Sequence, residues 1–235
     1  MKRLIVLMIA VVALVTGLGS VAQAKYASIV VNENTGEVMY SRNADKQLYP
    51  ASLTKIMTLY MLFEALDNGQ VRMDTKMKVS KLAASRSPSK LGLKPGSYIT
   101  VENAIMALIT KSANDVATVI SEHLGKSERA FAKKMTRKAH ALGMSQTTFR
   151  NASGLPHSQQ KSTARDMAKL AIAIRRDFPH YFISSKPNPL NIMVAASKTI
   201  IPFSAVILAQ MVSKPVTSVP LALIWWQPWS AAASG

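Results

Sequence analysis

The 235-residue chain contains no cysteine, so it has neither a disulfide framework nor a thiolate metal site. Acidic residues are scarce: there are 12 against 29 lysines and arginines, and none follows Asp177. The resulting formal net charge of +17 favours anionic surroundings. The four histidines show no metal-ligand spacing, so we expect no metal and no cofactor.

The first 24 residues have the layout of a secretory signal peptide. Met1-Lys2-Arg3 precedes an apolar stretch from Leu4 to Val15, and Ala22-Gln23-Ala24 provides a cleavage site of small residues. Gly17 and Gly19 interrupt the uncharged run that continues to Ala24, which argues against the alternative of a membrane anchor. We therefore expect cleavage after Ala24 and a periplasmic protein. Nucleic acid is then not a partner, whereas cell-wall polymer or an anionic membrane surface is accessible.

The rest of the sequence predicts a hairpin followed by helices. Strands are expected at 26–31 and 37–40, joined by a turn that contains Gly36. Helices are expected at about 50–67, 100–111, 115–124, 127–142 and 163–176, separated by polar stretches and loops. The first helix is apolar around nearly its whole circumference, which predicts that it is buried. Residues 183–235 contain many prolines and predict an atypical apolar tail without good strands.

Ser52 opens the buried helix, and Lys55 follows three residues later on the same side. A serine hydroxyl is a poor nucleophile at neutral pH and needs an adjacent base, so this spacing indicates acyl transfer through Ser52. The alternative is that Ser52 is an ordinary helix N-cap. The same Ser-x-x-Lys spacing occurs at Ser87 and Ser158, but a proline follows Ser87, and Ser158 lies in a predicted loop.

A second motif, Ser112-Ala113-Asn114, lies between two predicted helices. The order of the two motifs resembles that of the penicillin-recognising serine acyl-transferases, whose third motif is Lys-Thr-Gly. Within that group, the chain is similar to the low-molecular-mass D-alanyl-D-alanine carboxypeptidases. The similarity covers roughly residues 26–182 and includes Phe149–Leu155 and Thr163–Asp166.

The resemblance implies an α+β fold, an α/β sandwich of the β-lactamase/transpeptidase-like type, of which residues 25–182 form an incomplete domain. It implies that Ser52 attacks the penultimate D-alanine of a peptidoglycan pentapeptide and that Lys55 takes the serine proton. Ser112 would relay a proton to the leaving amine, and Asn114 would bind the substrate. β-Lactam antibiotics would be covalent ligands of the same serine.

The third motif is absent from the sequence. Lys198-Thr199 comes nearest, but Ile200 follows where a glycine is needed. In the family, this motif binds the terminal carboxylate of the substrate and its strand supplies an oxyanion donor, so we expect impaired activity. Two alternatives stay open. One is a β-lactamase of the same superfamily, although the glutamate of its Glu-x-x-Leu-Asn motif is missing; the other is a non-enzymatic, truncated relative that only binds wall peptides.

Overall fold

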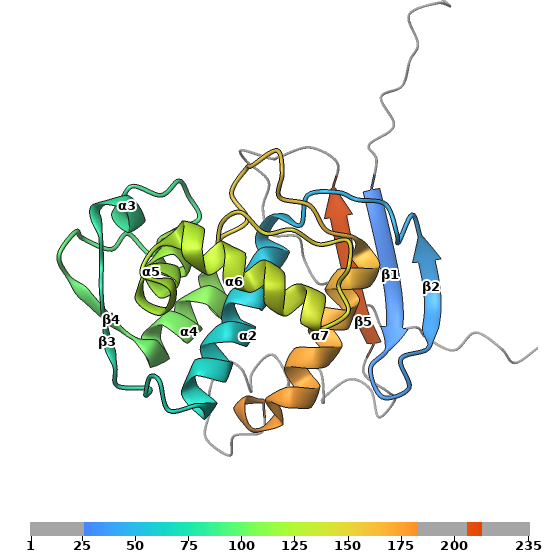
Figure 1. The fold of residues 1–235 in the computed structure, drawn as a ribbon, viewed down its shortest axis with the longest axis horizontal. Coiled ribbons are helices and arrows are strands. Elements are labelled where there is room, and N and C mark those ends of the chain that lie inside the picture. The colour runs from blue at the N-terminus through green and yellow to red at the C-terminus, as the bar shows by residue number, and fades with distance from the viewer. Residues whose placement is uncertain (1–25, 183–205, 213–235) are drawn as a thin grey trace, which may run out of the picture.

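The computed structural model describes residues 26–182 and 206–212. The predicted signal peptide and Lys198 lie outside the described residues. β1 (Tyr26–Asn32) and β2 (Val38–Arg42) form the predicted antiparallel hairpin. The described helices and strands are arranged as an α+β fold, with helices packed beside a small sheet (Figure 1).

A third strand, β5 (Val206–Val212), lies along the other edge of β1, giving the sheet order β2-β1-β5 (Figure 1). The pairing is antiparallel and runs from Tyr26 opposite Val212 to Asn32 opposite Val206. The expectation of no good strand after residue 183 is therefore wrong for this segment. Its seven residues contain no proline, so each backbone N–H is available to the ladder. The strand carries no Lys-Thr-Gly sequence.

The five predicted helices are confirmed, with small differences at their ends. They are η1 (Ala51–Leu53) continuing into α2 (Thr54–Asp67), α4 (Val101–Lys111), α5 (Asn114–Gly125), α6 (Glu128–Ala141) and α7 (Ala164–Asp177). Short elements that the sequence did not predict are β3 (Lys76–Lys78), α3 (Lys81–Ala84), β4 (Tyr98–Thr100) and η2 (Pro179–Tyr181). None of the described helices is long and apolar enough to cross a bilayer.

Side-chain caps explain where three of these helices begin. The hydroxyls of Thr100, Ser127 and Thr163 accept hydrogen bonds from backbone N–H groups three residues later, at the start of α4, α6 and α7. Such bonds satisfy N–H groups that have no partner within the helix, which is why serine and threonine favour this position.

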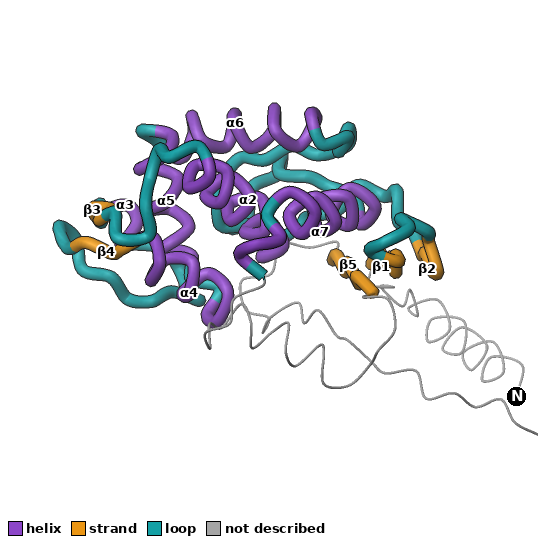
Figure 2. Tube along the Cα trace, turned by 90° about the horizontal axis from the view of Figure 1, so that it is seen from below, coloured by secondary structure: helices purple, strands orange, loops and turns teal. Residues whose placement is uncertain are grey.

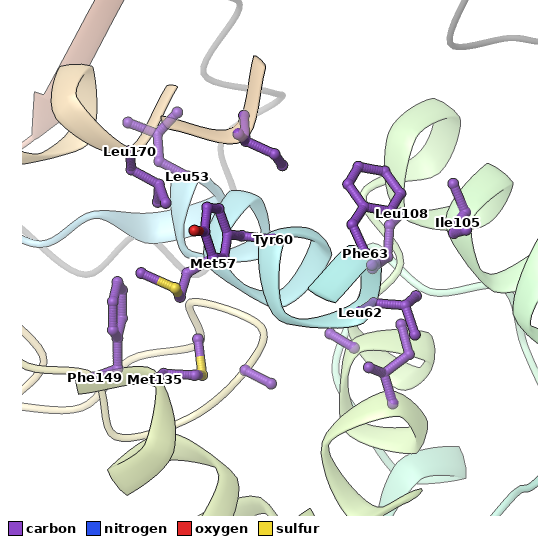
Figure 3. Close-up of a cluster of buried hydrophobic side chains, with 14 of the residues drawn as sticks. Leu53, Met57, Tyr60, Leu62, Phe63, Ile105, Leu108, Met135, Phe149 and Leu170 are labelled. Atoms are coloured by element: carbon purple, nitrogen blue, oxygen red, sulfur yellow. The ribbon is translucent and has the colours of Figure 1, made fainter. Parts of the chain in front are cut away.

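The core is built around α2. Met57, Leu62 and Phe63 of this helix are fully buried, and Phe149, Leu108 and Leu170 from other elements surround it (Figure 3). α7 lies against β1 and β5, and α2 packs against α4, α5, α6 and α7 (Figure 2). The predicted burial of the first helix is thus confirmed, and its first turn carries Thr54 and Lys55 into the core.

Candidate active site

Ser52 lies in η1, the tight turn that leads into α2. Its side chain is half-buried, whereas Leu53, Thr54 and Lys55 are buried. The turn is unusual because Ala51 has a positive φ of 46°. The structure therefore leaves the serine accessible from outside while the residues that follow it enter the core.

Gly154 packs directly against this turn. It has a φ of +87°, and a Cβ atom at this position would lie 1.8 Å from the Ala51 carbonyl oxygen and 3.1 Å from the Ser52 nitrogen. Only a residue without a side chain fits here, in both conformation and space. The loop Asn151–Gly154 is thus in close contact with the backbone that carries Ser52.

Lys55 is buried with only 4% of its surface exposed. Its Nζ atom donates a hydrogen bond to the Ser153 carbonyl oxygen at 2.6 Å. Burial lowers the pKa of Lys55 from 10.5 to about 7, because the charged ammonium is taken out of water. A large fraction of this amine is then neutral near pH 7, which is the form that can accept a proton.

The second motif lies at the junction of α4 and α5. Ser112 ends α4 in a left-handed conformation, with φ of 51° and ψ of 42°, and α5 begins at Asn114. Asn114 is buried. Its Nδ2 atom donates a hydrogen bond to the Ser87 carbonyl oxygen at 3.0 Å, and its backbone N–H donates to the Ser89 carbonyl oxygen at 2.8 Å. In this state its side chain holds the 87–89 segment, and substrate binding by Asn114 stays a prediction.

The structure places the two motifs on neighbouring elements, because α2 packs against both α4 and α5. Among the described residues, no hydrogen bond joins Lys55 to Ser52, Ser112 or Asn114. Catalytic hydrogen bonds are often long before substrate binds and shorten in the complex, so the proton transfer between these residues stays a prediction.

Asp115, which follows the second motif, is a structural residue that sequence reasoning did not assign. Its fully buried carboxylate accepts hydrogen bonds from the backbone N–H groups of Leu91, Gly92 and Leu93, at 2.8 to 3.1 Å. The only signal in the sequence was its position directly after Asn114. Together, Asn114 and Asp115 fix the segment from Ser87 to Leu93 beside the second motif.

A surface cavity of about 590 Å³ lies elsewhere, between the β3-β4 sheet and α4. Leu93, Tyr98 and Met106 contribute to its lining. None of the four candidate catalytic and substrate-binding residues lines this cavity, so we assign the site from the motifs and their contacts.

The chain is similar to known D-alanyl-D-alanine carboxypeptidases in sequence and in structure. The chain is 39% identical over 145 residues to D-alanyl-D-alanine carboxypeptidase DacF of Bacillus subtilis, covering 62% of this chain and 37% of DacF. Its structure is similar to that of DacD from Francisella tularensis, with a TM-score of 0.64 and 37% identity over 65% of this chain and 37% of DacD. It also resembles penicillin-binding protein D2 from Listeria monocytogenes in the ampicillin-bound form, with a TM-score of 0.58 and 35% identity over 65% of this chain and 62% of that one.

These similarities confirm the fold class: the described elements form part of the fold of the penicillin-binding proteins. The family model for D-alanyl-D-alanine carboxypeptidases, peptidase family S11, matches residues 19–199. The chain belongs to this family of serine-type carboxypeptidases. It spans about two fifths of the length of the curated relatives that it matches, 37% of DacF and 42% of the D-alanyl-D-alanine carboxypeptidase DacC of Escherichia coli.

Proposed function

We propose that the chain is a serine-type D-alanyl-D-alanine carboxypeptidase acting on peptidoglycan stem peptides through an acyl-enzyme on Ser52. The observation that carries the proposal is a buried lysine, with a pKa of about 7, three residues after an accessible serine at the start of a core helix. This is the pairing of nucleophile and base that acyl transfer needs. Membership of the carboxypeptidase family supplies the substrate class.

In the proposed reaction, Ser52 Oγ attacks the carbonyl carbon of the penultimate D-alanine while neutral Lys55 takes the hydroxyl proton. The tetrahedral intermediate collapses as its bond to the terminal D-alanine nitrogen breaks. Ser112 relays a proton to that nitrogen, and free D-alanine leaves. Water then hydrolyses the ester on Ser52, while Asn114 contributes to holding the peptide. β-Lactams acylate the same serine.

We propose that this activity is weak. The sequence contains no Lys-Thr-Gly, the motif that binds the terminal carboxylate of the substrate in this family. The strand that carries the motif also supplies one of the two hydrogen-bond donors to the oxyanion, so this donor is missing as well. Loss of one oxyanion donor lowers a rate about 100- to 1000-fold. The same absence favours a second candidate, a relative without catalytic activity that only binds wall peptides. A β-lactamase is a third, although its deacylating glutamate is missing from the sequence.

Labelling with a fluorescent penicillin tests the proposed function. We expect the wild-type chain to become labelled and Ser52→Ala to stay unlabelled. Ser158→Ala is the matched control, because Ser158 is also a Ser-x-x-Lys serine but is exposed; it should label like wild type. With a pentapeptide, the wild-type chain should release D-alanine at least about 100-fold more slowly than DacF assayed in parallel.

Each other outcome of this experiment contradicts a specific part of the proposal. An unlabelled wild-type chain would favour the non-enzymatic binder, and rapid loss of the label with hydrolysed penicillin would favour the β-lactamase. D-alanine release as fast as that of DacF would refute the impairment.

We also propose that the protein is exported and works in the periplasm, on the basis of the charged, apolar and small-residue regions of its first 24 residues. Its excess of basic residues favours association with anionic membrane surfaces. Protein recovered from a periplasmic extract should begin at Lys25 or within one or two residues of it, as read by N-terminal sequencing. A product that retains Met1 in the membrane fraction would instead establish an anchor.

A further inference from the structure

Glu128 is the first residue of α6, a position where acidic side chains usually remain in water near the positive end of the helix dipole. Here the side chain is only 12% exposed. One carboxylate oxygen pairs with the Arg86 guanidinium, and the other accepts a hydrogen bond from the Ala152 backbone N–H at 3.2 Å. The Arg86 guanidinium is also fixed, because its Nε donates to Thr118 Oγ1 at 2.9 Å. Glu128 is thus anchored and in turn holds Ala152.

The loop that Glu128 holds is the one that Lys55 contacts. The Ala152 carbonyl oxygen accepts a hydrogen bond from Thr58 Oγ1 at 2.7 Å, and the next carbonyl, that of Ser153, accepts from Lys55 Nζ at 2.6 Å. Thr58 and Lys55 lie one turn apart on α2. Two successive carbonyls therefore bind α2 while the N–H of Ala152 binds α6, and Ala152, Ser153, Thr58 and Lys55 are all buried.

We propose that Glu128 is a positioning residue for Lys55: through the Ala152–Ser153 peptide it fixes the carbonyl oxygen that the Lys55 amine binds. The residue does not touch the reacting atoms. The inference deepens the proposed function, and rests on it for the role of Lys55 as base, but the hydrogen bonds that carry it exist whether or not the chain is active.

Removal of the carboxylate has a definite consequence for Lys55. The buried Ala152 N–H would lose its acceptor and Arg86 its anion, so the loop would move toward other partners or water. The Ser153 carbonyl would move with it and open the surroundings of Lys55. Within residues 26–182 no charged side chain contacts the Lys55 amine, and burial alone lowers its pKa. Access of water would therefore raise that pKa toward 10.5 and reduce the neutral fraction near pH 7.

The test is a direct titration of Lys55 in the full chain. Lysine labelled with ¹³C at Cε is followed by NMR, and the Lys55 signal is assigned by its loss in Lys55→Met. We expect a wild-type midpoint near 7. Glu128→Ala should raise it by about one unit or more, and Glu128→Gln, whose amide oxygen can still accept from Ala152, should raise it less.

Glu64→Gln is the matched control. Glu64 forms a part-buried pair with Lys138 that also joins α2 to α6, and among the described residues its side chain makes no hydrogen bond to the 151–154 loop. Its removal should leave the Lys55 midpoint unchanged. A purely structural role for Glu128 would lower the melting temperature and leave the Lys55 midpoint where it is.

A functional readout follows from the same titration. A one-unit rise lowers the neutral fraction of Lys55 at pH 7 from about one half to about one tenth, so penicillin should acylate Glu128→Ala about 5-fold more slowly there. The difference in acylation rate between Glu128→Ala and the wild type should become smaller toward pH 9, where Lys55 is mostly neutral in both proteins. An unchanged Lys55 midpoint in folded Glu128→Ala overturns the proposal, and so does an unchanged midpoint in Glu128→Leu, whose side chain has no acceptor for the Ala152 N–H, if the alanine variant does not fold. An unlabelled wild-type chain would refute the proposed function instead, and the NMR titration would still test Glu128.

Discussion

Replacement of Lys55 by methionine should slow the acylation of Ser52 by penicillin about 100- to 10,000-fold, the usual contribution of general base catalysis. Methionine is apolar and unbranched and suits a buried site, so the loss would reflect the missing base. The wild-type rate should rise as pH increases through about 7 and then level off, because the neutral amine is the active form. Lys55→Met should show no such rise.

The same variant has an expected signature in stability. The folded-state pKa of Lys55 is lowered to about 7 from 10.5, so the unfolded chain binds more protons between these values. The free energy of unfolding of the wild type, relative to that of Lys55→Met, should therefore increase by roughly 2 kcal/mol from pH 7 to pH 9. Urea unfolding of both proteins measures this difference. Parallel pH profiles, or acylation of the variant within tenfold of wild type, would show that Lys55 is not a buried base.

Substitution of Gly154 by alanine should be strongly destabilising and should also disturb the turn that carries Ser52. The new Cβ would lie 1.8 Å from the Ala51 carbonyl oxygen, which is backbone and cannot rotate away. Such overpacking usually costs about 1–3 kcal/mol, and the positive φ adds about 1 kcal/mol more. We expect a loss of about 3 kcal/mol in the free energy of unfolding, with slower penicillin labelling of the protein that remains folded.

Gly92→Ala is the matched control for this substitution. Gly92 has nearly the same φ, +86° against +87°, but no atom lies within 4 Å of the position that a Cβ would occupy there. In Gly92→Ala, the free energy of unfolding should fall only by the conformational cost of the positive φ, about 1 kcal/mol, and penicillin should label this variant like the wild type. Equal losses for the two variants in chemical denaturation would show that contact with Ala51 does not determine the effect.

The features that the sequence predicted well depend on nearby residues. A continuous run of apolar residues predicted α2 as a buried helix. Three other helices were expected to begin at residues 100, 127 and 163, where the structure has the capping hydroxyls of Thr100, Ser127 and Thr163. Each of these signals acts over a few residues, so it can be recognised without the tertiary structure. The placement of Ser52 at the start of α2 followed from the same local pattern.

The partners of the candidate residues could not be predicted in this way. Lys55 binds a carbonyl 98 residues away, and Asp115 binds N–H groups more than 20 residues before it. Nothing in the local sequence distinguishes Glu128 from an exposed residue in the first turn of a helix. The β5 strand was missed because prolines on both sides obscured seven residues that can pair with β1.

The order of the strands in the sheet has a consequence for how the chain folds. β1 pairs with β2, its neighbour in sequence, and with β5, which comes from the far end of the described chain. A hairpin closes within microseconds, whereas contacts between distant residues form slowly. During synthesis, one edge of β1 must therefore stay without its partner until residues 206–212 have been made. An open edge is a template for pairing with another molecule, so the pairing of β5 with β1 ends the exposure of this edge to aggregation.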